Sequence, residues 1–172
     1  LSGVAQSYNY YPAVNMSHKD GIVSLSAGLG KTAVERERTF AFCPAFPKLD
    51  MFPPEDIVQN NQRHFYAVDT NLTDFDLILG EDSTLARIRI TQNLLENELD
   101  LLGSVWDYEN KQFLSGKYIK GPRVITYRNI LHYSQVPLAP LLKDFLILGR
   151  ELLGCEVEME FAFDINSQTG KQ

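Results

Sequence analysis

The chain has few of the residues that build metal sites and disulfides. It holds two cysteines and three histidines among 172 residues. Cys43 and Cys155 are far apart and lack the spacings of a disulfide framework, so we expect both to stay reduced, as in a cytoplasmic protein. His18, His64 and His132 form no HxH, HExxH or Cys/His cluster, which argues against a zinc site.

Positive charge and long apolar runs are also scarce. The chain has 16 Lys and Arg against 22 Asp and Glu, a formal net charge of -6. Nucleic acids and anionic membranes need concentrated Lys and Arg, so the sequence predicts neither as a partner. The longest apolar segment, around 145–148, is far shorter than the ~18 residues that a membrane span requires.

What is present is typical of one globular domain. The length suits a single domain with a sizeable core, and the contents of 44% hydrophobic and 22% charged residues are ordinary. The sequence opens at Leu1 inside a predicted strand and closes just after a turn-like segment with no returning strand. We therefore expect a piece of a longer protein.

Short runs of alternating or β-branched residues outnumber helical patterns. The predicted strands are 3–9, 21–27, 38–43, 64–68, 85–90, 101–108, 112–116, 123–127 and 156–165, and the shorter predicted helices are 31–36, 56–62, 72–79 and 91–99. The clearest helix begins near Pro137, carries leucines at helical spacing and ends before Gly154, a typical C-terminal cap. The fold class is α+β, a mainly antiparallel sheet with one long amphipathic helix packed on it.

The segment SLSAGLGKTAV, residues 24–34, raises the question of a phosphate-binding P-loop. That motif needs a glycine five residues before the Gly-Lys-Thr element, and the residue at that position is Leu25. A bulky residue there prevents the backbone amides from cradling a phosphate. The residues therefore favour a glycine turn at the end of a strand, and they argue against a P-loop.

The last predicted strand has an acidic face. Glu156, Glu158 and Glu160 alternate with apolar residues, so their side chains are spaced ~7 Å apart on one face. Mg²⁺ prefers one or two carboxylates together with substrate phosphates, but the residues alone favour a solvated outer face of a sheet as the explanation of the pattern. Arg87 and Arg89 share a strand face and could meet a phosphate or these glutamates. No catalytic nucleophile and base can be assembled from the sequence.

Three segments in order carry a resemblance to a known family. LSGVAQSYNYYP, DGIVSLSAGLGKTAVE and GCEVEMEFAFDIN resemble the nucleotide-binding domain of phosphoenolpyruvate synthase and pyruvate phosphate dikinase. The chain is most similar to a synthase-like branch, and RVITYRNILHYSQVPLAPLLKDFLILGRELLG resembles that branch's approach to the last strand. In this reading residues 1–172 are one partial domain, with an inserted section at about 44–136.

The resemblance implies an ATP-grasp fold, of which this chain is much of the C-terminal subdomain. It implies that Glu160, in Met159-Glu160-Phe161, supplies a carboxylate to the Mg²⁺ at the ATP phosphates, with Glu158 supporting it. Gly28, Leu29 and Gly30 match the family's glycine loop at the nucleotide. The parent enzyme is then an ATP-dependent phosphotransferase of the pyruvate, water dikinase type, acting on a small-molecule acceptor.

The chain also departs from the family pattern. Lys31 stands where the family usually has an acidic residue, and Arg36 replaces a glycine. The family's Gln-x-Arg-Pro strand, its N-terminal subdomain, its phosphohistidine domain and its pyruvate-binding barrel are not in these 172 residues. Phosphoryl transfer needs several positioned charges at once, so we expect this chain alone to be inactive and to bind MgATP weakly.

Two alternatives stay open at this stage. The chain could be a non-catalytic ATP-grasp relative whose inserted section mediates interactions or regulation. It could instead be an acidic α+β interaction domain for a small ligand or a protein. The identity of the acceptor and the oligomeric state do not follow from the sequence.

Overall fold

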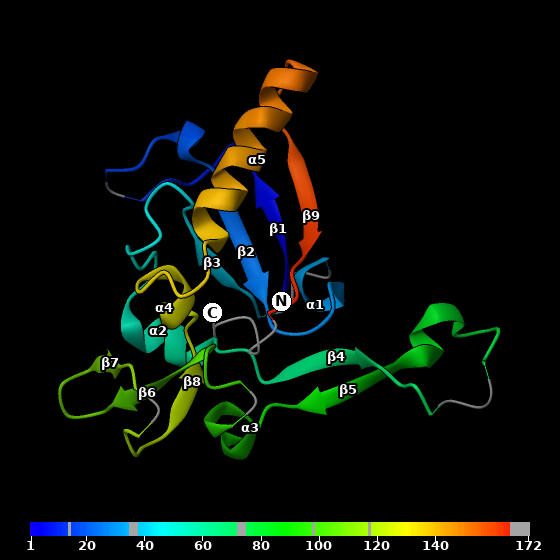
Figure 1. The fold of residues 1–172 in the computed structure, drawn as a ribbon, viewed down its shortest axis with the longest axis vertical. Helices are drawn as coiled ribbons and strands as arrows, with labels where there is room; N and C mark the ends of the chain where they lie inside the picture. The colour runs from blue at the N-terminus through cyan, green and yellow to red at the C-terminus, as the bar shows by residue number, and fades with distance from the viewer. Residues whose placement is uncertain (14, 35–37, 72–74, 98, 117, 166–172) are drawn as a thin grey trace, which may run out of the picture.

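A computed structural model describes residues 1–165, apart from 14, 35–37, 72–74, 98 and 117. The fold is α+β, as the sequence predicts: the described strands form antiparallel sheets, and one longer helix packs against strands (Figure 1). In the part of the chain that the structure describes, no helix is long and apolar enough to cross a membrane.

The regular elements are short except for α5. The described strands are β1 (Ser2–Gln6), β2 (Ile22–Ser26), β3 (Phe40–Phe42), β4 (His64–Val68), β5 (Leu85–Arg89), β6 (Gly103–Asp107), β7 (Gln112–Leu114), β8 (Arg123–Ile125) and β9 (Glu158–Ala162). The described helices are α1 (Lys31–Val34), α2 (Pro54–Gln59), α3 (Gln92–Glu96), α4 (Arg128–Leu131) and α5 (Leu138–Leu153), with 3₁₀ turns η1 (His18–Asp20) and η2 (Gly80–Thr84).

The largest sheet joins the two ends of the chain. Its strand order is β3-β2-β1-β9, and every neighbouring pair is antiparallel. The pairing of β1 with β9 extends to Leu1, whose carbonyl accepts a hydrogen bond from the Phe163 amide at 2.7 Å. Gly3 makes this pairing close, because a Cβ there would lie 2.5 Å from the Phe161 ring and 2.4 Å from the Ser24 carbonyl oxygen.

One face of this sheet is covered by α5, and the main core lies between them (Figure 1). Leu142 and Leu146 of the helix and Ala5, Val23 and Leu25 of the strands are all buried. Each fully buried leucine contributes about 1.5–3 kcal/mol relative to exposure, so this interface supplies much of the drive for folding. The predicted cap is confirmed, since the residue after α5 adopts the left-handed conformation with φ 68°.

A second, smaller core lies under the sheet β7-β6-β8. The predicted hairpin of β6 and β7 is confirmed, with Asp107 paired to Gln112. Trp106 and Phe113 of the two strands pack at 4.9 Å between ring centroids, and Ile57 of α2 joins them. The third sheet is the hairpin β4-β5, which projects away from the rest of the molecule in Figure 1.

Some predicted boundaries were wrong. Strand β1 ends at Gln6, before the predicted limit of 9, and β9 is shorter than 156–165. The helix predicted at 72–79 does not form over its described part, 75–79, while 72–74 lie outside the described residues. The Asp76 carboxylate accepts the Ile78 and Leu79 amides at 2.8 and 3.3 Å, a local turn that competes with helix formation. Helix α4 was not predicted.

Both cysteines are free thiols, as predicted from their spacing. Cys43 is buried and Cys155 is exposed. Burial raises the pKa of the Cys43 thiol, which favours the unreactive protonated form.

Candidate functional site

The two predicted magnesium ligands lie on the sheet face that α5 leaves uncovered. Glu160 of β9 pairs directly with Val4 of β1, which in turn pairs with Ser24 of β2. Side chains alternate between the faces along a strand, and directly paired residues share a face. Met159 and Phe161 therefore point toward α5, while Glu158 and Glu160 point away from it and are exposed, as the alternation predicts.

The glycine loop reaches this same face. The Ser2 hydroxyl donates to the Gly28 carbonyl at 2.9 Å and lies 3.2 Å from the Ser26 hydroxyl. Ser2 is two residues before Val4 on β1, so its side chain lies on the face that carries Glu160. Ser2 also pairs with Ala162, so the loop lies at the end of the sheet toward which β9 runs. The structure therefore brings Gly28 and Glu160 to one face.

Of the two glycines in the loop, only Gly28 needs to be glycine. Its φ is +86°, and a Cβ there would lie 2.8 Å from both the Phe65 Cβ and the Tyr66 carbonyl oxygen. A Cβ at Gly30 would meet no atom within 4 Å, and Gly30 is not among the described glycines with positive φ. Leu29 is partly exposed, and its amide donates to the Tyr66 carbonyl at 3.0 Å.

Gln62 fixes the residue that precedes the loop. Its carboxamide oxygen accepts the Ala27 amide at 2.9 Å and the Tyr127 hydroxyl at 3.3 Å. Its nitrogen donates to the carbonyls of Ala27 at 3.0 Å and His64 at 2.7 Å. Burial raises the pKa of Tyr127, so its phenol stays a neutral donor. Sequence reasoning missed Gln62, because its partners are far apart in the chain and no local pattern marks it.

The lysine of the loop is engaged by the β4–β5 hairpin. Lys31 forms an ion pair with Asp82, and its Nζ lies 5.6 Å from the centroid of the Tyr66 ring. Leu25 is buried inside β2. The segment is thus a glycine turn leaving a strand, as the residues favoured.

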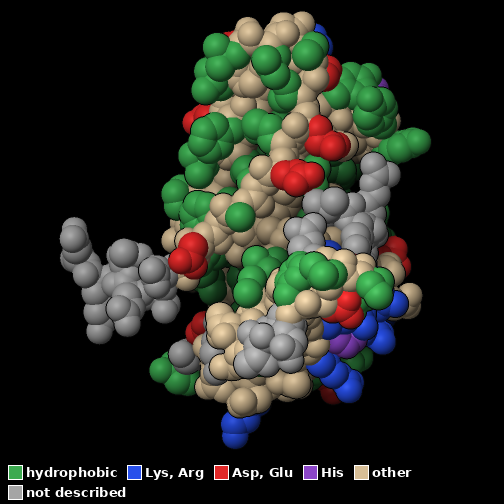
Figure 2. All heavy atoms as spheres, turned by 90° about the vertical axis from the view of Figure 1, so that its right-hand side faces the viewer, with side chains coloured by type: hydrophobic (Ala, Val, Ile, Leu, Met, Phe, Trp, Pro, Cys, Tyr) green, Lys and Arg blue, Asp and Glu red, His purple; other side chains and the backbone are tan. Residues whose placement is uncertain are grey.

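Arg87 and Arg89 share one face of β5, as predicted, but β5 belongs to a different sheet from β9. Arg87 pairs directly with Tyr66, so it lies on the hairpin face that Lys31 approaches. Figure 2 shows most of the basic side chains of the face in view gathered on its lower half, where the hairpin lies in Figure 1, and acidic side chains on both halves.

The three glutamates differ in their surroundings. Glu158 accepts a hydrogen bond from the Gln6 carboxamide. Glu156 lies outside β9, where it accepts the Ser7 hydroxyl at 2.5 Å and comes within 3.9 Å of Arg150. The predicted acidic row of three residues is therefore reduced to Glu158 and Glu160, and the latter has no ion-pair partner among the described residues.

The donor set suits magnesium in its usual mode of binding. No group of three or more His, Cys, Asp or Glu side chains in the described part of the chain could hold a metal ion alone. Mg²⁺ is commonly held by one or two carboxylates together with substrate phosphates and water. Glu160 and Glu158, two residues apart on one exposed face, supply that number of carboxylates.

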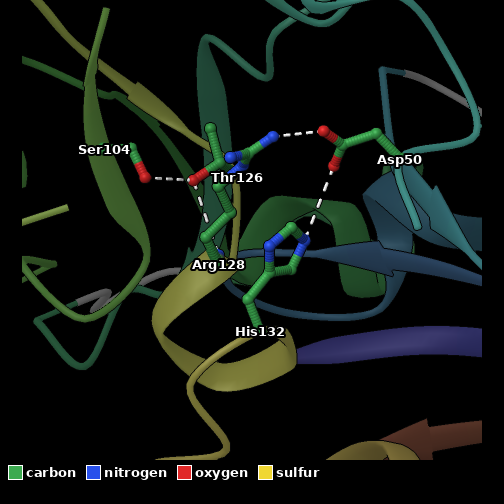
Figure 3. A network of polar contacts seen from close by, with 5 residues as sticks. All are labelled: Asp50, Ser104, Thr126, Arg128 and His132. Carbon is green, nitrogen blue, oxygen red and sulfur yellow. Dashed lines mark hydrogen bonds and ion pairs between the residues drawn. The ribbon is translucent and has the colours of Figure 1, made fainter. Parts of the chain in front are cut away.

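A second polar cluster lies away from this face. Asp50 forms an ion pair with Arg128, and its other oxygen lies 3.6 Å from the His132 Nε2 (Figure 3). The Thr126 hydroxyl, 2.6 Å from that of Ser104, accepts the Arg128 amide at 3.5 Å. Arg128 also stacks on Phe113 at 4.8 Å from the ring centroid. These contacts anchor the loop before α2 to α4. The sequence offered one signal for this cluster: Arg128 and His132 are four residues apart, a spacing that places two side chains on the same face of a helix.

Comparison with known proteins identifies no relative of the chain. No protein-family model, no curated protein and no solved structure matches it. The arrangement of the residues therefore carries the functional argument.

Proposed function

We propose that this chain is the ATP- and magnesium-binding portion of a phosphoenolpyruvate synthase-like phosphotransferase, an ATP-grasp-like C-terminal subdomain. One observation carries the proposal: the hydrogen bond from Ser2 to the Gly28 carbonyl sets the glycine loop on the sheet face from which Glu160 projects. A nucleotide needs both features on one surface, and this surface is the one that α5 leaves open.

Each feature of the face has a role in this proposal. Glu160 and Glu158 hold Mg²⁺, which neutralises phosphate charge when bound. The left-handed Gly28 lets the loop turn closely against Phe65 and Tyr66 of β4, which holds the loop at this face. Arg87 of the neighbouring hairpin adds positive charge beside the loop, on the hairpin face that Lys31 approaches, and the charge of Lys31 is paired with Asp82. The chain supplies a metal site and a loop, and the phosphoryl acceptor binds to other parts of the parent enzyme.

The test uses Mn²⁺ and ATP as a paramagnetic probe on the isotopically labelled chain. We expect weak binding that broadens the amide signals of Val4, Gly28 and Glu160, which flank the proposed site. Glu160→Gln removes a ligand charge and is expected to abolish this broadening. Glu156→Gln removes the same charge from a residue already engaged by Ser7 and Arg150, and should preserve it.

Two outcomes contradict the proposal. One is equal loss of broadening in the two variants, which would mean that only overall charge attracts the metal. The other is broadening confined to signals far from the glycine loop. No phosphoryl transfer is expected from the isolated chain, so turnover is not the readout.

A further inference from the structure

A cavity of about 220 Å³ lies at the opposite edge of the main sheet from Glu160. It opens between the edge strand β3 and helix α2, and its apolar walls are formed by Phe40, Ile57, Ile125 and Tyr127. An engineered apolar cavity of about 150 Å³ binds benzene, so this space accommodates an aromatic ring with a short side chain. It is distinct from the candidate nucleotide site.

The polar groups in the depth of the cavity are already satisfied by the protein. Gln62 makes four hydrogen bonds to Ala27, His64 and Tyr127. The Asn61 carboxamide donates to the Ile125 carbonyl at 2.6 Å and accepts the Ile125 amide at 3.2 Å. The interior therefore provides apolar contacts and few free hydrogen-bonding groups. It favours a ligand whose buried part is apolar.

The mouth of the cavity, unlike its apolar interior, carries an exposed carboxylate. Asp56 is exposed there, with no ion-pair partner among the described residues. No Lys or Arg is among the lining residues, and the nearby Arg38 donates to the Gln59 carbonyl of α2 at 3.4 Å. Phe52 lies at the rim with 53% of its surface exposed. Inside, the rings of Phe40 and Tyr127 meet edge to face at 5.5 Å. Aromatic faces and a carboxylate together attract a cation and repel an anion.

We propose that this cavity binds a small organic amine. The aromatic or aliphatic body of the ligand lies against Phe40, Ile125 and Tyr127, and its ammonium group sits at the mouth beside Asp56 and Phe52. Nothing in the proposed nucleotide site requires this second ligand, so either proposal can fail without the other.

Three probes of matched shape test the proposal, each titrated into the chain and followed by amide NMR signals of β3 and α2. Phenethylamine carries the cation, 2-phenylethanol is its neutral isostere and phenylacetate carries the opposite charge. We expect phenethylamine to bind about three- to tenfold more tightly than the alcohol, the range that one exposed ion pair and one cation–π contact provide. Phenylacetate is expected to bind more weakly than both.

Two neighbouring carboxylates give a matched pair of variants. Asp56→Asn should remove the ion-pair part of this advantage and lower the affinity for phenethylamine toward that of the alcohol. Glu55→Gln removes the same charge from the preceding residue, whose carboxylate is 3.2 Å from Lys111 and does not line the cavity, and should leave the affinity unchanged. Phe52→Ala, at a side chain with 53% of its surface exposed, should weaken phenethylamine more than the alcohol, because it removes the cation–π contact as well as apolar contact.

The proposal is overturned by any of three results. These are equal binding of amine and alcohol, equal loss in the Asp56 and Glu55 variants, or no shift of the β3 and α2 signals with phenethylamine.

Discussion

Gln62 and Ala27 form a reciprocal pair of hydrogen bonds, each offering one donor and one acceptor to the other at 2.9 and 3.0 Å. Gln62, two residues before β4, thereby holds Ala27, the residue that follows β2. The same carboxamide also binds the His64 carbonyl and the Tyr127 hydroxyl. Three segments far apart in the sequence are thus held at the base of the glycine loop by one side chain.

Replacing Gln62 by Ala is expected to lower the free energy of unfolding by about 2–4 kcal/mol. The substitution removes the Gln62 partner of the buried Ala27 amide, the Ala27 carbonyl and the Tyr127 hydroxyl, and each buried group left unsatisfied costs about 1–3 kcal/mol. Urea denaturation measures the change. Gln59→Ala, at an exposed site of α2, should stay within about 0.5 kcal/mol of the parent chain. Equal effects of the two variants would refute the structural role of Gln62.

The two glycines of the loop are expected to respond differently to alanine. Gly28→Ala forces a left-handed backbone on a residue with a side chain, which costs about 1–3 kcal/mol before the overlap with Phe65 and Tyr66 is counted. Gly30→Ala enters open space at the start of α1 and should be neutral or stabilise by up to about 1 kcal/mol. Urea unfolding of both variants measures the two changes in the free energy of unfolding. An equal loss in Gly30→Ala would contradict the difference between the two glycines.

The parts of this fold that the sequence predicts are those with a local cause. Alternation placed Glu158 and Glu160 on one face of β9, and leucine spacing with Gly154 located α5 and its end. The turn between β6 and β7 was also visible, because the two strands are adjacent in the chain.

The parts that escaped prediction depend on distant partners or unusual backbone. Helix α4 follows Tyr127, whose left-handed φ of 53° is rare for a residue with a side chain. Asp50 and Arg128 are separated by 78 positions, and no short pattern connects them. The candidate site shares this feature, since only the pairing of β1 with β9 brings Glu160 to the face where the Gly28 carbonyl lies.

Asp50→Asn is expected to lower the free energy of unfolding by about 1–2 kcal/mol, between the values typical of exposed and of buried ion pairs. The Asp50 and Arg128 side chains are 22% and 19% exposed, so solvent screens the pair only in part. Without the carboxylate, Arg128 and His132 lose the negative charge that they share. Thermal or urea unfolding measures the loss. Asp144→Asn, exposed on α5, is the control and should change stability by less than about 0.5 kcal/mol.

His132 is expected to make the protein less stable in mild acid. Burial, followed by the positive charge of Arg128, lowers the pKa of His132, while Asp50 opposes the shift. Below the ordinary histidine pKa of about 6.5 the unfolded chain therefore binds the proton more readily than the folded chain. The free energy of unfolding then falls as the pH drops through that window, until the folded pKa is reached. Urea titrations between about pH 5 and 7.5 should show this slope reduced in His132→Gln and steepened in Asp50→Asn, because removing Asp50 depresses the pKa further. An unchanged slope in His132→Gln would assign the acid sensitivity to other groups.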